Sequence, residues 1–168
     1  METRRHPQVT SLAEVEPVTL SHGEKFGAVR KRLAAASGAR ELGCSWIEVP
    51  PGRQAFPRHY HYGNEEAVFV LSGTGELRLG AQRIPIAGGD YVALPAGGPE
   101  GHAIVNTGSA PLQYLGISTA HSTDVVVYPD SGKFSAVGGA DMHKGLKAAP
   151  FNRLLQDQPG VDYYLGED

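Results

Sequence analysis

Two histidines separated by one residue, His59 and His61, are the residues best suited to chemistry, and Glu65 and Glu66 follow them closely. On a β-strand, residues two apart share a face and lie about 6.6 Å apart along the backbone. Two imidazoles at this spacing can converge on one metal ion, and a carboxylate from a neighbouring strand can complete the set. The pattern also occurs without a metal, because a His-x-His pair can be incidental and adjacent glutamates can be solvated turn residues.

The elements around these residues are predicted to be short strands. The 168 residues include 22 glycines and 12 prolines, which are spread along the chain between segments rich in Val, Ile, Leu, Tyr and Phe. A spacing of about 8–12 residues between such segments is typical of sandwiches and jelly rolls. The predicted strands cover residues 18–20, 42–49, 58–62, 66–71, 76–79, 82–86, 91–94, 102–106, 112–118 and 125–128.

Residues 26–38 are ambiguous, because their Ala, Lys and Arg content fits a helix while their pattern also fits a strand. We favour a strand to about Leu33 and an irregular loop to Gly38. Three regions follow: an extended N-terminal arm over residues 1–22, one β-barrel over 23–135, and a loop-rich C-terminal tail over 136–168 that packs on or near the barrel.

Composition excludes several classes of partner. The formal net charge of −3 gives no electrostatic footprint for nucleic acid or an anionic membrane. The longest apolar run, Ala67 to Leu71, is far too short to span a bilayer, and no apolar segment of a secretory signal follows the N-terminus. The single cysteine, Cys44, excludes an intrachain disulfide and a cysteine-rich zinc site, and we expect it to be a buried structural thiol. These features predict a cytoplasmic protein.

The wider spacing around the two histidines forms two motifs. The chain reads Gly52-x6-His59-x-His61-x4-Glu66-x6-Gly73 and then Gly89-x5-Pro95-x-Gly97-x4-His102-x3-Asn106. This pattern resembles the paired motifs of the cupin superfamily, with one extra residue after Gly52 and two extra residues before His102. Both insertions fall in expected loops, where added residues are tolerated.

The resemblance extends to a subgroup of single-domain bacterial cupins, to some of which the label sugar-phosphate isomerase has been attached. It rests on the stretches Phe56-Pro57-x-His59-x-His61, Ala93 to Gly97 and Val127 to Lys133. It implies an all-β double-stranded β-helix, or jelly-roll barrel. Single-barrel cupins commonly form homodimers, which would also cover exposed strand edges.

The resemblance also implies a site. Its metal ligands would be His59, His61, Glu66 and His102, with Glu66 preferred to Glu65 because it keeps both the x4 and the x6-Gly spacing. Such ligands suit one divalent transition metal ion per chain, and Fe, Mn, Ni, Co, Cu and Zn are not distinguished. Glu100, in the loop before His102, is a catalytic acid–base residue if the protein is an enzyme, although a solvated loop carboxylate is the simpler interpretation.

The function predicted from these features is that of a metal-dependent enzyme acting as an isomerase or oxygenase on a small polar metabolite, such as a sugar or sugar phosphate. The alternative is a non-catalytic cupin that binds a metal or a small ligand, since one barrel serves many functions. Arg53 and Arg58 could hold an anionic substrate, or they could be ordinary surface charges.

Overall fold

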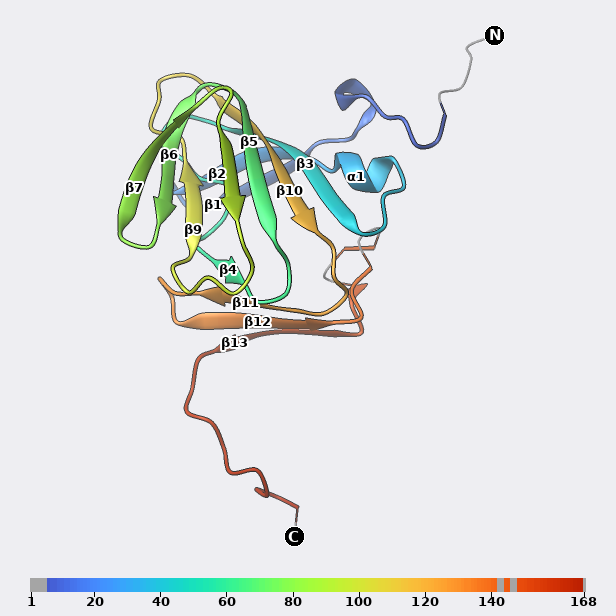
Figure 1. The fold of residues 1–168 in the computed structure, drawn as a ribbon, viewed down its shortest axis with the longest axis vertical. Helices are drawn as coiled ribbons and strands as arrows, with labels where there is room; N and C mark the ends of the chain where they lie inside the picture. Colours follow the sequence, from blue (N-terminus) through green and yellow to red (C-terminus); the bar gives the residue numbers. More distant parts are fainter. Residues whose placement is uncertain (1–5, 142–143, 146–147, 168) are drawn as a thin grey trace.

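Short antiparallel strands make up almost the whole fold of the computed structural model, which describes residues 6–141, 144–145 and 148–167 (Figure 1). The first strands are β1 (Val18–His22), β2 (Phe26–Lys31), β3 (Leu42–Val49), β4 (Tyr60–His61), β5 (Glu66–Ser72), β6 (Thr74–Leu79) and β7 (Gln82–Ala87). They are followed by β8 (Tyr91–Leu94), β9 (His102–Val105), β10 (Leu112–Thr119), β11 (Asp124–Tyr128), β12 (Lys133–Gly138) and β13 (Phe151–Gln156). Two single turns of helix, η1 (Leu12–Glu14) and α1 (Leu33–Ala36), precede β1 and β3.

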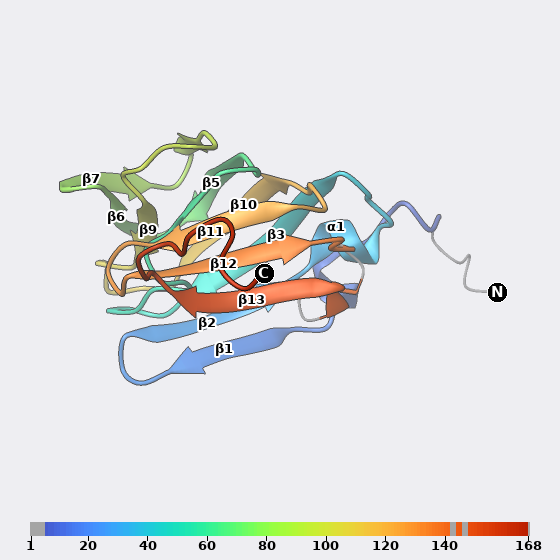
Figure 2. The ribbon, with the colours of Figure 1, turned by 90° about the horizontal axis from the view of Figure 1, so that it is seen from below.

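These strands form three sheets. The largest has the order β1-β2-β3-β10-β5-β8, the second has the order β13-β12-β11-β4, and β6 lies between β7 and β9 in the third. Figure 1 draws β11, β12 and β13 below the strands of the largest sheet, and Figure 2 shows from below that they lie across it. The chain is thus layered as a jelly roll, and its interior lies between the sheets.

The apolar core lies between the six-stranded and three-stranded sheets. Its members are inward-facing residues, and in β3, β6 and β10 they alternate with half-buried residues as the two-residue period requires. They include Ile47, Val49, Val68, Val70, Leu77, Ile104, Leu112 and Tyr114. The interior between β2, β3, β10 and β11 is more polar, and the predicted functional residues lie beside it.

The predicted fold class, an all-β jelly roll, is confirmed, but the details differ in three places. The sheets do not pair into one closed barrel. The strand expected up to Leu33 ends at Lys31, and the alanine-rich segment after it forms α1. The tail from residue 136, expected to be mostly loop, contains the end of β12 and all of β13, which pair with each other along their full length.

The ends of the described chain lie apart from the strands. Beyond β13, residues 157–167 are exposed and extend away from the sheets (Figure 1). Within the described residues, neither helix has the length and apolar character of a membrane span.

Candidate metal site

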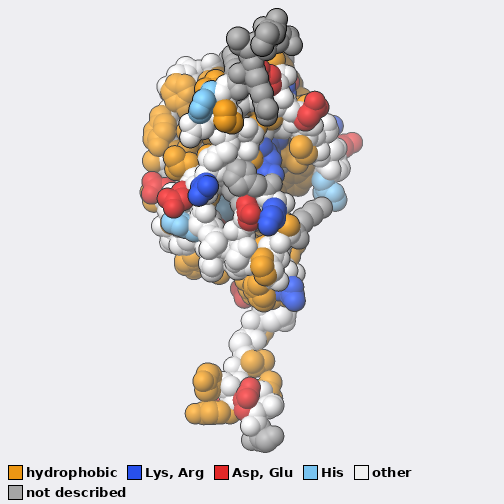
Figure 3. Space-filling model, turned by 90° about the vertical axis from the view of Figure 1, so that its right-hand side faces the viewer, with side chains coloured by type: hydrophobic (Ala, Val, Ile, Leu, Met, Phe, Trp, Pro, Cys, Tyr) orange, Lys and Arg blue, Asp and Glu red, His pale blue; other side chains and the backbone are white. Residues whose placement is uncertain are grey.

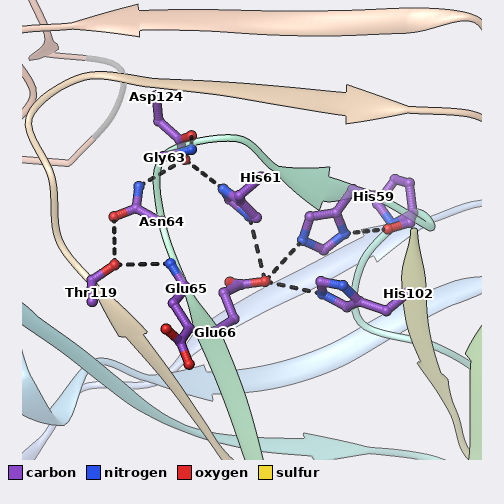
Figure 4. Close-up of polar contacts among 10 residues, drawn as sticks. His59, His61, Gly63, Asn64, Glu65, Glu66, His102, Thr119 and Asp124 are labelled. Atoms are coloured by element: carbon purple, nitrogen blue, oxygen red, sulfur yellow. Dashed lines mark hydrogen bonds and ion pairs between the residues drawn. The ribbon is translucent and has the colours of Figure 1, made fainter. Parts of the chain in front are cut away.

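The four predicted ligands come together where the three sheets meet (Figure 4). His61 lies in β4 of the four-stranded sheet, Glu66 begins β5 of the six-stranded sheet, and His102 begins β9 of the three-stranded sheet. His59 precedes β4 and forms an antiparallel bridge with His102. Each sheet therefore contributes a side chain, so the site depends on the complete fold.

One carboxylate oxygen is the centre of the cluster. Glu66 Oε2 lies 3.5 Å from His59 Nε2, 3.4 Å from His61 Nε2 and 3.0 Å from His102 Nε2. The ligand atoms of His59, His61 and Glu66 all lie within 4.8 Å of one another. The three imidazoles are only 12–16% exposed, so little water can compete for their nitrogens.

The other ring nitrogens of two histidines are held by hydrogen bonds. His59 Nδ1 lies 2.7 Å from the carbonyl oxygen of Pro57, which can only accept. His61 Nδ1 lies 2.5 Å from Asp124 Oδ2. An acceptor at Nδ1 places a proton on that nitrogen, so in the neutral form of each ring Nε2 carries the lone pair that faces Glu66. This orientation by an outer acceptor is usual for metal-bound histidine.

Such lone pairs and a carboxylate oxygen repel each other unless a proton or a cation lies between them. A divalent transition metal suits the donor set of imidazole nitrogens and one carboxylate. The residues present therefore fit the metal ion that the spacing predicted.

Asp124, at the start of β11, is a second centre of hydrogen bonding. Its carboxylate accepts from the His61 ring, from the Gly63 N–H at 2.8 Å and from Asn64 Nδ2 at 2.7 Å. Burial alone would raise the pKa of Asp124, but these hydrogen bonds lower it, so the group is held as a carboxylate. A charged Asp124 fixes both the tautomer and the orientation of His61.

Burial and hydrogen bonding also have opposite effects on the pKa values of the cluster residues, and together they set its charge. Burial would raise the pKa of Glu66, but the contacts with His102, His59 and His61 hold it far below its ordinary value. Burial lowers the pKa of His102 and opposes protonation of His61, whose pKa is nevertheless raised by the hydrogen bond to Asp124 and the charge of Glu66. Glu66 is thus ionised at neutral pH.

Other predicted residues lie outside this cluster. Glu65 is exposed, and its backbone N–H donates to Thr119 Oγ1, so Glu66 is the glutamate turned toward the imidazoles. Glu100 is exposed in the loop before β9, and in the described part of the chain its carboxylate has no hydrogen bond or ion pair with the cluster. Arg58 pairs with Asp130 at 2.7 Å, and Arg53 donates to the carbonyl of Phe26.

Two pockets reach the cluster from different sides. The smaller, of about 350 Å³, is lined by His61, His102, Glu100 and the Pro95–Gly98 segment. The larger, of about 600 Å³, is lined by His61, Glu66, Arg30, Ser45 and other residues of β2, α1, β3, β10 and β11. Both volumes suit a small molecule.

Sequence reasoning missed Asp124 and Arg30. Asp124 lies just before a predicted strand, where a turn carboxylate attracts no notice, although its polar side chain is only 7% exposed. Arg30 lies two residues after the buried Ala28, so the strand alternation could have placed it on the inward face. Cys44, expected to be buried, is partly exposed and lines the larger pocket.

Residues 45–118 match the family model of the cupin domain, and this segment contains all four residues of the cluster. This part of the chain is therefore similar to a cupin domain. Two solved structures resemble the chain over most of its length. A candidate sugar phosphate isomerase from Acidithiobacillus ferrooxidans is 28% identical, with a TM-score of 0.77 over 93% of this chain and 97% of that one. A sugar phosphate isomerase of the superfamily from Silicibacter pomeroyi is 27% identical, with a TM-score of 0.71 over 84% and 94%.

The curated relatives match less than half of this chain. An oxalate-binding protein from Thermotoga maritima is 32% identical over 71 residues, which is 42% of this chain and 56% of that protein. Across the curated relatives, the matched segment spans from 23% to 56% of their length.

Proposed function

We propose that this protein is a metal-dependent enzyme that isomerises a small polar metabolite of the sugar-phosphate kind, with His59, His61, Glu66 and His102 holding one divalent ion. The observation that carries the proposal is the convergence of three imidazole Nε2 atoms on Glu66 Oε2 at 3.0–3.5 Å. The names of the two similar structures favour isomerisation over other cupin chemistry.

Different residues of the site would have different roles in this reaction. When bound, a divalent ion polarises a carbonyl or hydroxyl oxygen of the substrate. The carbonyl of Pro57 orients the His59 ring, and the carboxylate of Asp124 orients the His61 ring, in each case through Nδ1 of the histidine. Glu100, which lines the smaller pocket with His61 and His102, is the proposed group for proton transfer to a substrate in that pocket.

A metal measurement tests the ligand set. Protein purified without chelators should contain about one divalent transition ion per chain. The His59→Ala/His61→Ala double variant should contain almost none, whereas a variant of the exposed His22 should keep the full amount. Equal metal content in the wild type and the double variant contradicts the assignment.

A substrate screen tests the reaction class. Isomerisation of an aldose or ketose phosphate rearranges hydrogen within one molecule and needs no second substrate, whereas an oxygenase consumes dioxygen. NMR of sugar phosphates incubated with metal-loaded protein should reveal a product without oxygen uptake. Oxygen uptake favours the oxygenase, and metal binding without turnover of any compound favours the alternative, a non-catalytic cupin that binds a small ligand.

Two further features belong to this proposal. We expect the protein to act in the cytoplasm, because its single cysteine suits a reducing compartment. We also expect a homodimer, because β1 and β13 are edge strands and β13 exposes Leu154 and Leu155.

A further inference from the structure

The larger pocket has a cationic side chain on its wall. Arg30 projects from β2 into the interior, where its guanidinium lies 5.9 Å from the ring centre of Phe56 and lines the same pocket as Glu66 and His61. Much of the remaining wall consists of small residues, which leave room for a ligand: Ala34, Ala35, Gly43, Ala120 and Ala140. One small molecule could therefore contact Arg30 and the candidate metal site together.

Only one of the hydrogen-bond donors of the Arg30 guanidinium has an acceptor in the described protein. Its Nε donates to Ser45 Oγ at 3.0 Å, and among the described residues it makes no ion pair and no other hydrogen bond. The four N–H groups of its two terminal nitrogens therefore have no acceptor among the described residues. None of its nitrogens is both buried and unsatisfied, so these donors face the open space of the pocket.

Several other charged side chains, which also line the pocket, already have partners. Glu66 contacts the three imidazoles, and Asp124 binds His61, Gly63 and Asn64. Asp141 lies 3.7 Å from Lys144, which lines the pocket together with Arg32. Lys and Arg side chains are seen near the middle of the face that carries α1 and the ends of β3 and β10 (Figure 3).

We propose that Arg30 binds an oxyanion group, a phosphate or a carboxylate, of the ligand that occupies the larger pocket. This proposal rests on the proposed function, because it assigns the class of substrate for the same site. A guanidinium presents paired N–H groups that match two oxygens of such an anion, and a partly desolvated pair is stronger than one in water. The Ser45 hydroxyl holds Nε and so orients the remaining donors toward the pocket.

The alternative is that Arg30 serves only the structure, by joining β2 to β3 through Ser45 and by packing its guanidinium against the Phe56 ring. Those roles use the Nε–H and one face of the guanidinium, and they leave the terminal N–H groups without acceptors. By contrast, Arg58 uses both ends of its guanidinium on Asp130 and on the carbonyl of Glu100, as a structural arginine does.

Anion titration by calorimetry tests the proposal, with methyl phosphate and acetate as probes of the metal-loaded protein. Binding of at least one probe should weaken about 10- to 100-fold in Arg30→Met. The matched control is Arg83→Met, because Arg83 is 62% exposed on β7 and pairs with Glu76 away from this pocket. The probe that binds more tightly identifies the group as phosphate or carboxylate.

Metal content separates this proposal from the proposed function. Arg30→Met should keep its metal, and the His59→Ala/His61→Ala variant should lose it. If binding of either probe falls in Arg30→Met, Arg30 is the anion site, whether or not binding of that probe also falls in the histidine variant. If it falls only in the histidine variant, or if neither probe binds the wild type, the Arg30 proposal is overturned while the metal assignment is judged on metal content alone.

A measurement on the unmodified protein covers the case in which Arg30→Met does not fold. Phenylglyoxal reacts with accessible arginines, and peptide mass spectrometry can follow each one. The bound probe should slow modification of Arg30 several-fold and leave that of Arg83 unchanged. Equal rates at Arg30 with and without the probe overturn the proposal.

Discussion

The backbones of His59 and His102 exchange two hydrogen bonds. The N–H of His59 donates to the carbonyl of His102 at 3.0 Å, and the N–H of His102 donates to the carbonyl of His59 at 2.8 Å. The two ring centres are consequently only 4.6 Å apart. Because the chain itself sets this distance, the site is preorganised before any ligand binds.

Replacement of His102 by alanine should weaken metal binding and leave the fold intact. The backbone pair with His59 does not use the imidazole, so the bridge survives, whereas one of the three nitrogen donors is lost. We expect metal affinity to fall at least about 10-fold, by comparison with the cost of losing even an outer-shell partner. Titration against a coloured chelator measures the affinity, and circular dichroism checks the fold. Unchanged affinity in a folded variant would remove His102 from the ligand set.

Replacement of Asp124 by asparagine should also weaken metal binding, although Asp124 touches no other member of the cluster than His61. The carboxylate accepts three hydrogen bonds, and an amide oxygen cannot accept them all. His61 would lose its fixed tautomer, and we expect about a 10- to 100-fold loss of affinity.

The matched control for Asp124→Asn is Asp157→Asn, because Asp157 is exposed beyond β13. The same chelator titration should give wild-type affinity for this control. Equal affinities for both variants would show that the charge of Asp124 does not act on the metal.

The site was predictable from the sequence because its residues lie close together or in a recognisable register. His59, His61 and Glu66 span eight positions, and the strand period alone places the two histidines on one face. The two extra residues before His102 do not displace it, since the backbone pair with His59 fixes its position and the loop absorbs the insertion.

Asp124 and Arg30 could not be identified in the same way, because long-range pairing brings them to the site. Asp124 is 63 residues from the His61 that it contacts. Similarly, β13 owes its existence to pairing with β12, since its own residues are mostly exposed and polar enough to suggest a loop. Local patterns carry little information about such partners.

Removal of the Asn106 side chain should destabilise the fold. This side chain is fully buried, and it donates to the carbonyls of Val49 and Ala110 and accepts from the Gly108 N–H. Asn106→Ala would remove three hydrogen bonds and take this donor from the buried carbonyl of Val49, at a cost of about 1–3 kcal/mol. Urea unfolding measures this change, and Gln82→Ala, in an exposed hairpin, should alter stability by less than about 0.5 kcal/mol.

Assembly can be tested through the exposed C-terminal segment. Val161, Tyr163, Tyr164 and Leu165 are 68–87% exposed, and burial of such side chains against a second copy would stabilise a dimer. Light scattering should give about twice the 17.8 kDa mass of one chain. Substitution of the two tyrosines by serine should weaken the dimer if this segment contributes, and a mass of one chain at micromolar concentration contradicts the dimer.

Cys44 offers a reporter of the larger pocket, because it is the single cysteine of the chain and lines that pocket with Arg30 and Glu66. Burial raises the pKa of its thiol above the ordinary value of 9.0, so the reactive thiolate is scarce at pH 8. Iodoacetamide should therefore label the native protein more slowly than the urea-unfolded chain, with a pH midpoint above 9.0.

The sign of the accompanying change in stability follows from the same shift. A thiol whose pKa is raised by folding contributes stability that is present below the unfolded pKa and is lost as the pH rises through the folded pKa.

Cys44→Ser removes the labelling signal and serves as the background of the labelling experiment. Methyl phosphate should slow labelling further in the wild type but not in Arg30→Met, since the anion would occupy the space beside the thiol. Native labelling as fast as in urea at pH 8 would mean that the thiol is not shielded by the fold.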